Sequence, residues 1–264
     1  MKQIKNDAKH GVLVKKKLKI QSLLSIESEN MNAPSINAPR LQFSRYETGE
    51  NPQYSIIWMH GLGDEGASFH TLFSSQLEHF DMDGLPAIRF IFPNAPERPV
   101  TAHSWLPARA WFDIYSGFDE SDMEDEQGIL DSAGLIHILI NNEKIKGIPT
   151  ENIFLAGFSQ GAAMALHTGF TYHEKLAGVI ALSGYIPLRQ TFEASRVKEN
   201  QDTPAFIGHG TEDPVVPFSR GENANKQLLE LGYNVEFHPY DMDHTLDWQE
   251  IQDMLDWLKK VINK

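Results

Sequence analysis

The chain has 264 residues, of which 41% are hydrophobic, and this is enough for one large α/β domain or two small ones. It contains no cysteine, which excludes disulfides, thiolate catalysis and cysteine metal sites, and no segment approaches the run of about 20 apolar residues that spans a membrane. The formal net charge of -13 argues against nucleic acid as a main partner.

Residues 1–30 differ from the rest of the chain, because they carry seven lysines against three acidic residues. No apolar h-region or cleavage site follows, so a secretory signal is not expected. Three interpretations stay open: a disordered basic arm, a weak anchor at a membrane surface, or an extension upstream of a true start at Met31. We favour a non-catalytic extension and linker over residues 1–40, followed by one folded domain over residues 41–264.

From residue 54 onward, strand-like apolar runs alternate with helical patterns. We expect strands at Tyr54–His60, Ala87–Phe92, Ile153–Ala156, Leu176–Leu182, Pro204–Gly208 and Asn234–Tyr240. Helices are expected at Ser68–Phe80, Gly128–Lys146, Gln160–Tyr172, Arg220–Leu231 and Trp248–Ile262, with residues 94–127 as a long irregular stretch. This alternation predicts an α/β fold with a mostly parallel sheet and helices on both faces. Ligands of such sheets bind beyond the carboxyl ends of the strands, so candidate site residues are those that follow each strand.

The strand at Ile153–Ala156 leads into Gly157-Phe158-Ser159-Gln160-Gly161, and a helix follows at once. This pentapeptide fits the G-x-S-x-G nucleophile elbow, a sharp turn that exposes a serine hydroxyl. The N-terminus of the following helix directs its N–H groups and positive dipole end at the place where an oxyanion forms. Taken without the rest of the chain, this segment has an alternative interpretation: a glycine-rich turn between strand and helix whose serine has no catalytic role.

An acyl-transfer serine also needs two donors for the oxyanion. One is the backbone N–H of Gln160, and the loop His60-Gly61-Leu62-Gly63-Asp64 supplies the other through the N–H of Leu62. The same loop also fits the dinucleotide pattern G-x-G-x-x-G. We discount that interpretation because Asp64 and Glu65 would repel a pyrophosphate.

A base must accept the serine proton, and elbows of this kind are followed along the chain by an acid and then a histidine. Asp213 follows the strand Pro204–Gly208 and precedes a proline-stiffened turn, whereas its neighbour Glu212 is expected to face solvent. His244 lies in the loop after the last strand. Ser159, Asp213 and His244 therefore follow successive strands and are expected to meet at one edge of the sheet, with Asp213 holding the imidazole that serves as base.

Together these segments resemble the acyl-protein thioesterase / carboxylesterase family of α/β hydrolases, the phospholipase/carboxylesterase group. The matching segments, in family order, are residues 60–64 (HGLGD), 92–96 (FPNAP), 110–113 (AWFD), 157–163 (GFSQGAA), 181–184 (ALSG), 209–217 (HGTEDPVVP) and 243–244 (DH). The resemblance implies an α/β-hydrolase catalytic domain over residues 41–264. It also implies that Ser159, Asp213 and His244 form the triad and that Leu62 and Gln160 give the oxyanion N–H groups.

The resemblance further implies a serine esterase that cleaves short- to medium-chain carboxylic esters through an acyl-enzyme. Thioesters on acylated proteins, as for a depalmitoylating enzyme, and lysophospholipids are alternative substrates, and a non-catalytic binding protein on this scaffold is an alternative function. We expect no cofactor, no metal, no nucleic acid and a cytoplasmic location, with weak peripheral membrane contact and a homodimer as open alternatives.

Residues 98–118 are expected to hold the acyl pocket. Trp105, Leu106, Trp111 and Phe112 are candidates for its lining, with ordinary packing as the alternative. The chain departs from the family pattern at Thr245-Leu246, where the family commonly has Ser-Val, and in its Lys-rich first 30 residues.

Overall fold

The computed structural model describes residues 40–115 and 124–264. The expectations for residues 1–30 and for a start at Met31 lie outside the described residues.

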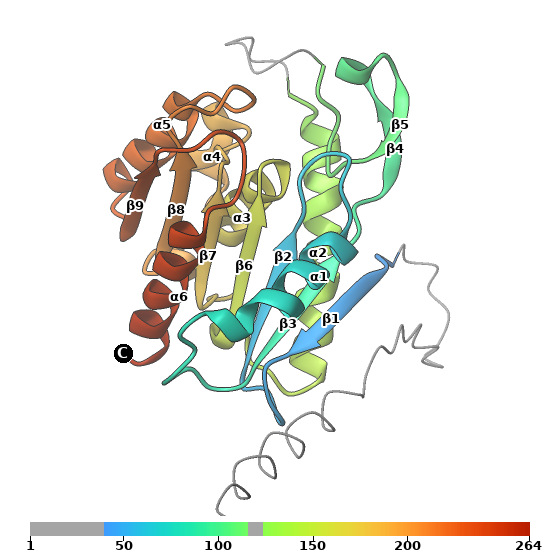
Figure 1. Ribbon diagram of the computed structural model, residues 1–264. Coiled ribbons are helices and arrows are strands. Elements are labelled where there is room, and N and C mark those ends of the chain that lie inside the picture. The colour runs from blue at the N-terminus through green and yellow to red at the C-terminus, as the bar shows by residue number, and fades with distance from the viewer. Residues whose placement is uncertain (1–39, 116–123) are drawn as a thin grey trace, which may run out of the picture. The chain divides into compact units, whose positions relative to one another are not determined.

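The described chain is built on a seven-stranded sheet with the order β1-β3-β2-β6-β7-β8-β9 (Figure 1). Its strands are β1 (Phe43–Glu47), β2 (Tyr54–Met59), β3 (Ile88–Pro93), β6 (Ile153–Phe158), β7 (Gly178–Leu182), β8 (Ala205–Gly210) and β9 (Val235–Tyr240). Strand β1 pairs antiparallel with β3, and every other pairing in this sheet is parallel. The expected α/β fold with a mostly parallel sheet is therefore confirmed.

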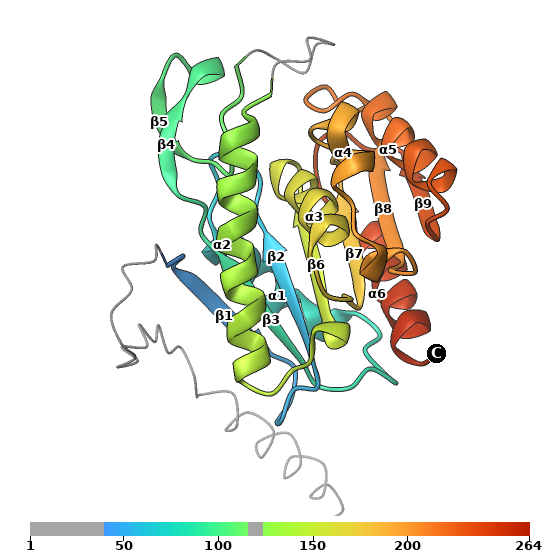
Figure 2. The same ribbon diagram turned by 180° about the vertical axis from the view of Figure 1, so that it is seen from behind.

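Helices cover both faces of the sheet (Figures 1 and 2). Helices α1 (Gly66–Gln76) and α6 (Trp248–Ile262) lie on one face; α2 (Glu126–Ile145), α3 (Gln160–Thr171), α4 (Arg189–Ser195) and α5 (Phe218–Glu230) lie on the other. Single 3-10 turns cover Leu77–His79, Thr101–His103, Thr150–Asn152 and Lys198–Asn200.

The central strands are buried on both faces, which explains their continuous apolar sequences. In β2, Ile57 and Met59 pack on the α3 side, whereas Ile56 and Trp58 pack on the α1 side, as the two-residue period of a strand requires. All four side chains are fully buried. The carboxyl ends of these parallel strands consequently meet at one edge, where the loops that follow them can cooperate.

The expectation of a long irregular stretch over residues 94–127 was wrong in part. Strands β4 (Glu97–Val100) and β5 (Leu106–Arg109) form a separate antiparallel hairpin. Helix α2 starts at Glu126 because the Asp125 side chain caps it, accepting a hydrogen bond from Gly128 N. The edge strand β1 and the short helix α4 were not predicted, since neither has a periodic apolar pattern long enough to stand out.

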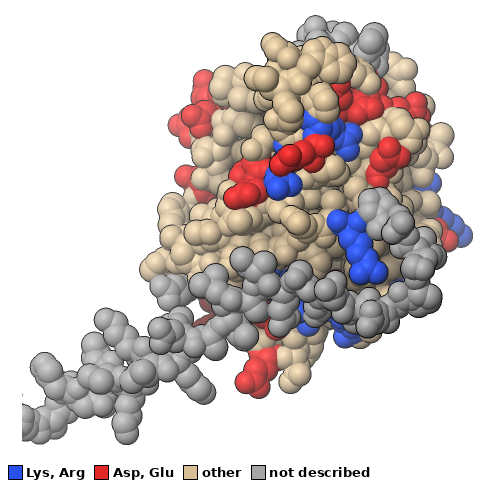
Figure 3. All heavy atoms as spheres, turned by 90° about the vertical axis from the view of Figure 1, so that its right-hand side faces the viewer, with Lys and Arg blue, Asp and Glu red and all other residues tan. Residues whose placement is uncertain are grey.

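Among the described residues, no helix is long and apolar enough to cross a membrane, and no group of three or more His, Asp or Glu is arranged to hold a metal ion. Figure 3 shows one face of the molecule, on which acidic and basic side chains occur together among broad uncharged areas.

Candidate functional site

Ser159 occupies a sharp turn between β6 and α3, with φ 55° and ψ −120°. This backbone conformation is strained for a residue with a side chain and persists only where the surroundings enforce it. They do so here, because Ser159 N donates to Leu182 O at 2.9 Å and Ser159 O accepts from Ala163 N at 3.1 Å. The turn leaves the serine almost buried, with 7% of its surface exposed.

The two glycines of the elbow are required by close approach of backbone to backbone. A Cβ atom on Gly157 would overlap the carbonyl group of Gly161, and a Cβ atom on Gly161 would overlap the carbonyl of Met59 in the neighbouring strand β2. Only glycine fits at either position. The G-x-S-x-G spacing is thus a packing requirement of the turn and of its contact with β2.

Ser159, His244 and Asp213 form a continuous chain of hydrogen bonds across three loops. The Ser159 hydroxyl lies 2.9 Å from His244 Nε2, and His244 Nδ1 lies 2.6 Å from Asp213 Oδ2. An ionised carboxylate only accepts, so His244 Nδ1 carries a proton and Nε2 is free to accept from the serine. The structure therefore brings together the three residues expected from the sequence, in the arrangement that activates a serine.

The Asp213 carboxylate is held in place by its own loop. Its Oδ1 accepts from Val215 N and Val216 N, both at 2.8 Å, so the group is a fixed acceptor for His244. His209 Nε2 lies 3.5 Å from Asp213 Oδ2 and 2.9 Å from Val216 O. Burial lowers the pKa of His209, so its ring is neutral and Nε2 donates to the Val216 carbonyl. His209 therefore lies beside the acid, a place that no motif in the sequence indicated.

The loop after β2 packs directly on the serine. A Cβ atom on Gly61 would lie 3.3 Å from the Ser159 Cβ, so the loop that carries Leu62 packs against the elbow at its neighbour Gly61. His60 holds the loop: its Nε2 accepts from Ala95 N at 3.0 Å, so Nδ1 carries the proton and donates to Gly61 O at 2.6 Å. Burial lowers the pKa of His60, which keeps this tautomer neutral.

Gln160 contributes to the site with both its backbone and its side chain. As the first residue of α3, its N–H has no partner within the helix and points to the helix N-terminus. Its side chain accepts from Trp111 N and donates to Phe112 O, each at 2.8 Å. The Trp111 indole also donates to His60 O at 2.9 Å. No sequence pattern predicts these hydrogen bonds, which join residues 111–112 to the elbow and to the loop after β2.

The four residues expected to line an acyl pocket do not lie together. Trp105 and Leu106 are 65% and 66% exposed on the β4–β5 hairpin, whereas Trp111 and Phe112 are buried. None of the four lines the cavity between α1 and α6 or the cavity beside the residues that precede β1. Trp111 and Phe112 instead pack in the apolar cluster on the α2 and α3 side of the sheet.

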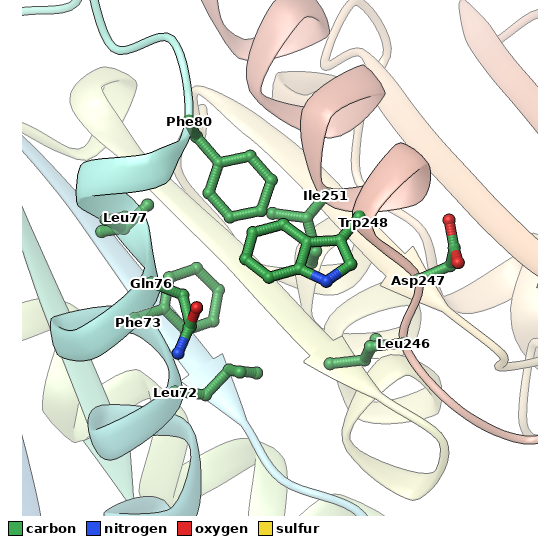
Figure 4. A pocket seen from close by; sticks show the side chains of 9 residues that line it. All are labelled: Leu72, Phe73, Gln76, Leu77, Phe80, Leu246, Asp247, Trp248 and Ile251. Atoms are coloured by element: carbon green, nitrogen blue, oxygen red, sulfur yellow. The ribbon is translucent and has the colours of Figure 1, made fainter.

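The cavity between α1 and the start of α6 has a volume of about 290 Å³, and we call it the α1–α6 groove (Figure 4). It is lined by Leu72, Phe73, Gln76, Leu77, Phe80, Leu246, Asp247, Trp248 and Ile251. Seven of these nine side chains are apolar, and Figure 4 shows them facing one another across the space between the two helices.

Comparison with known proteins places this geometry in a family. The chain matches the phospholipase/carboxylesterase family model over residues 45–262, from β1 to the end of α6. It is similar to acyl-protein thioesterase 1 of Yarrowia lipolytica, with 37% identity over 80% of this chain and 92% of that protein. Acyl-protein thioesterase 1 of Schizosaccharomyces pombe is also 37% identical, over 79% of this chain and 91% of the relative.

Solved structures agree with this assignment. The crystal structure of Arabidopsis thaliana SOBER1 superposes with a TM-score of 0.73 at 31% identity, covering 79% of this chain and 99% of that one. The crystal structure of Zea mays acyl-protein thioesterase 2 gives a TM-score of 0.70 at 28% identity, covering 83% of this chain and 99% of that one.

Proposed function

Because this chain belongs to the phospholipase/carboxylesterase family of α/β hydrolases, and is therefore a serine hydrolase of esters or thioesters, we propose that it cleaves short- to medium-chain carboxylic esters through an acyl-enzyme on Ser159. The observation that carries this proposal is the hydrogen-bonded chain from the Ser159 hydroxyl through His244 to Asp213. The family supports the class of reaction, and the geometry supports the roles of these residues.

In acylation, Ser159 Oγ attacks the substrate carbonyl carbon while His244 Nε2 takes the hydroxyl proton. The resulting imidazolium is stabilised by Asp213, whose carboxylate stays ionised and holds the ring through Nδ1. His244 then returns the proton to the leaving alcohol or thiol, and the C–O or C–S bond breaks. In deacylation, a water molecule loses a proton to His244 and attacks the acyl carbon. The bond between this carbon and Ser159 Oγ then breaks, and His244 returns the proton to Oγ, which releases the acid and the free serine.

The negative charge that develops on the carbonyl oxygen needs donors that are already in place. The N–H of Gln160 at the start of α3 and the N–H of Leu62 beside the elbow are the proposed pair. Losing one such donor typically costs about 3 kcal/mol of transition-state stabilisation. The His60 hydrogen bonds to Gly61 and Ala95 support this role, because they hold the Leu62 loop in one shape.

The test is the variant Ser159→Ala. It removes the nucleophile, so we expect hydrolysis of p-nitrophenyl butyrate to fall by about 10⁶-fold and labelling by a fluorophosphonate probe to disappear, while circular dichroism stays that of the folded protein. A variant that kept wild-type turnover would overturn the proposal. A wild-type protein that is folded but neither labels nor hydrolyses any ester would favour a non-catalytic binding protein.

A second candidate substrate is an acylated protein, because relatives with 37% identity are named acyl-protein thioesterase 1. Esters and thioesters with the same acyl chain, compared over a series of chain lengths, distinguish the candidates. A maximum at short esters supports a general carboxylesterase. Preference for a palmitoylated peptide supports a depalmitoylating thioesterase, and release of fatty acid from lysophosphatidylcholine supports a lysophospholipase.

Location and assembly are further proposals. We propose a cytoplasmic location. Weak membrane contact through residues 1–30 is the open alternative, and sedimentation with liposomes, with and without those residues, tests it. Analytical ultracentrifugation separates a monomer from a homodimer.

A further inference from the structure

The α1–α6 groove begins beside the proposed base. Leu246, which lines it, follows His244 by two residues, and the partly buried Phe158 ring lies 4.7 Å from the His244 ring. Phe158 and Leu246 both pack against the apolar cluster on this face of the sheet, which also contains Phe73, Leu77 and Ile251 of the groove. At the far end, the Phe80 ring packs 4.8 Å from the Trp248 ring. The groove therefore runs from Leu246 toward the pair Phe80–Trp248 (Figure 4).

The chemistry of the proposed function determines which part of a substrate lies on this side. His244 Nε2 must return its proton to the leaving-group oxygen or sulfur, so that atom lies within about 3 Å of the ring. The carbonyl oxygen is instead held by the proposed donors, the N–H groups of Leu62 and Gln160. The leaving-group atom thus lies at His244, and the nearest part of the groove lining along the chain is Leu246, two residues on.

The lining of the groove restricts the chemistry of its occupant. Its volume of about 290 Å³ is at the small end of ligand pockets, and its walls are aromatic and aliphatic. Gln76 and Asp247 are the polar residues among those that line it. Asp247 caps α6 by accepting from Gln249 N at 2.7 Å, so its carboxylate stays at the wall and repels an anionic group.

From these contacts we propose that the α1–α6 groove is the leaving-group subsite of this enzyme and takes the uncharged alkyl or aryl part of an alcohol or thiol. This inference rests on the proposed function and adds a preference on the side of the substrate opposite to the acyl chain. It assigns a role in specificity to Leu72 and Trp248, which line the groove from α1 and α6.

The test is a panel of butyrate esters with methyl, hexyl and naphthylmethyl alcohols. Leu72 and Trp248 are 39% and 55% exposed, so Leu72→Asp and Trp248→Ala leave the buried core intact. We expect kcat/KM for the two large alcohols to fall at least about tenfold, because one methylene in an apolar pocket already contributes a factor of this order. The value for methyl butyrate should stay within about twofold of wild type. The matched control is Leu229→Asp on α5, where the leucine is 52% exposed, and it should change neither value.

Two results would overturn the inference. One is an equal loss for methyl and hexyl butyrate in Leu72→Asp and Trp248→Ala. The other is a change of acyl-length preference at a fixed methyl leaving group, which would assign the groove to the acyl chain. In both cases hydrolysis of methyl butyrate by the wild type leaves the proposed function standing. Absence of hydrolysis of every ester by the wild type would instead overturn the proposed function itself.

Discussion

The carboxyl group of Glu250 lies directly against the backbone of Gly208, so closely that a Cβ atom on this glycine would overlap Glu250 Oε1. Glu250 is in the first turn of α6, six residues after His244, and Gly208 is in β8, five residues before Asp213. The contact packs the helix that follows the base against the strand that precedes the acid. Glu250 is fully buried, and this burial raises its pKa to about 8, with the nearby carboxylates of Asp247 and Asp253 adding to the shift.

The raised pKa predicts how stability depends on pH. Between pH 4.5 and 8 the folded protein keeps the Glu250 proton that the unfolded chain releases, so the free energy of unfolding falls as pH rises through this window. Glu250→Gln removes the titrating group, and we expect the variant to gain on the order of 4 kcal/mol relative to wild type between pH 4.5 and pH 9. Urea denaturation of both proteins at several pH values measures this difference.

The matched control is Glu230→Gln, because the Glu230 side chain is 65% exposed. Its stability should follow wild type at every pH. Parallel pH curves for wild type and Glu250→Gln would show that Glu250 is ionised in the folded protein at neutral pH.

Asp213→Asn tests the hydrogen bond that orients the base. The amide oxygen can still accept from Val215 N and Val216 N, but the NH₂ group would face His244 Nδ1 and favour the tautomer with the proton on Nε2. His244 could then no longer accept from Ser159. We expect kcat for p-nitrophenyl butyrate to fall by about 10⁴-fold, with the fold unchanged.

The adjacent residue provides the comparison for this variant. Glu212 is exposed, whereas Asp213 is buried, so Glu212→Gln should retain activity within about twofold. If the two substitutions had similar effects on kcat, Asp213 would not be the acid of the triad.

Gln160→Met tests the tether between the elbow and residues 111–112. Methionine has a similar length but cannot bond to Trp111 N or Phe112 O, so two buried backbone groups lose their partner. Each such group costs about 1–3 kcal/mol, and we expect the free energy of unfolding to drop by about 2–5 kcal/mol in urea denaturation. The N–H of residue 160 remains, so the folded fraction should still label with a fluorophosphonate. Unchanged stability would mean that these two hydrogen bonds contribute little.

Much of the site could be predicted because its residues are ordered by the chain. Ser159, Asp213 and His244 each follow a strand whose apolar run is visible in the sequence, and parallel strands bring their carboxyl ends to one edge. The residues expected to line the acyl pocket were harder to predict. Trp111 and Trp105 are both aromatic residues in a segment without periodicity, yet Trp111 is fully buried and Trp105 is 65% exposed.

The sequence alone therefore determined the class of fold, the family and the order of the candidate catalytic residues, because these depend on local periodicity and on short motifs. The tertiary structure decided which residues meet across distant segments: Gln160 with Trp111 and Phe112, Glu250 with Gly208, and α1 with the start of α6. No local pattern encodes these contacts, since they arise when elements far apart in the chain pack and their buried polar groups find partners.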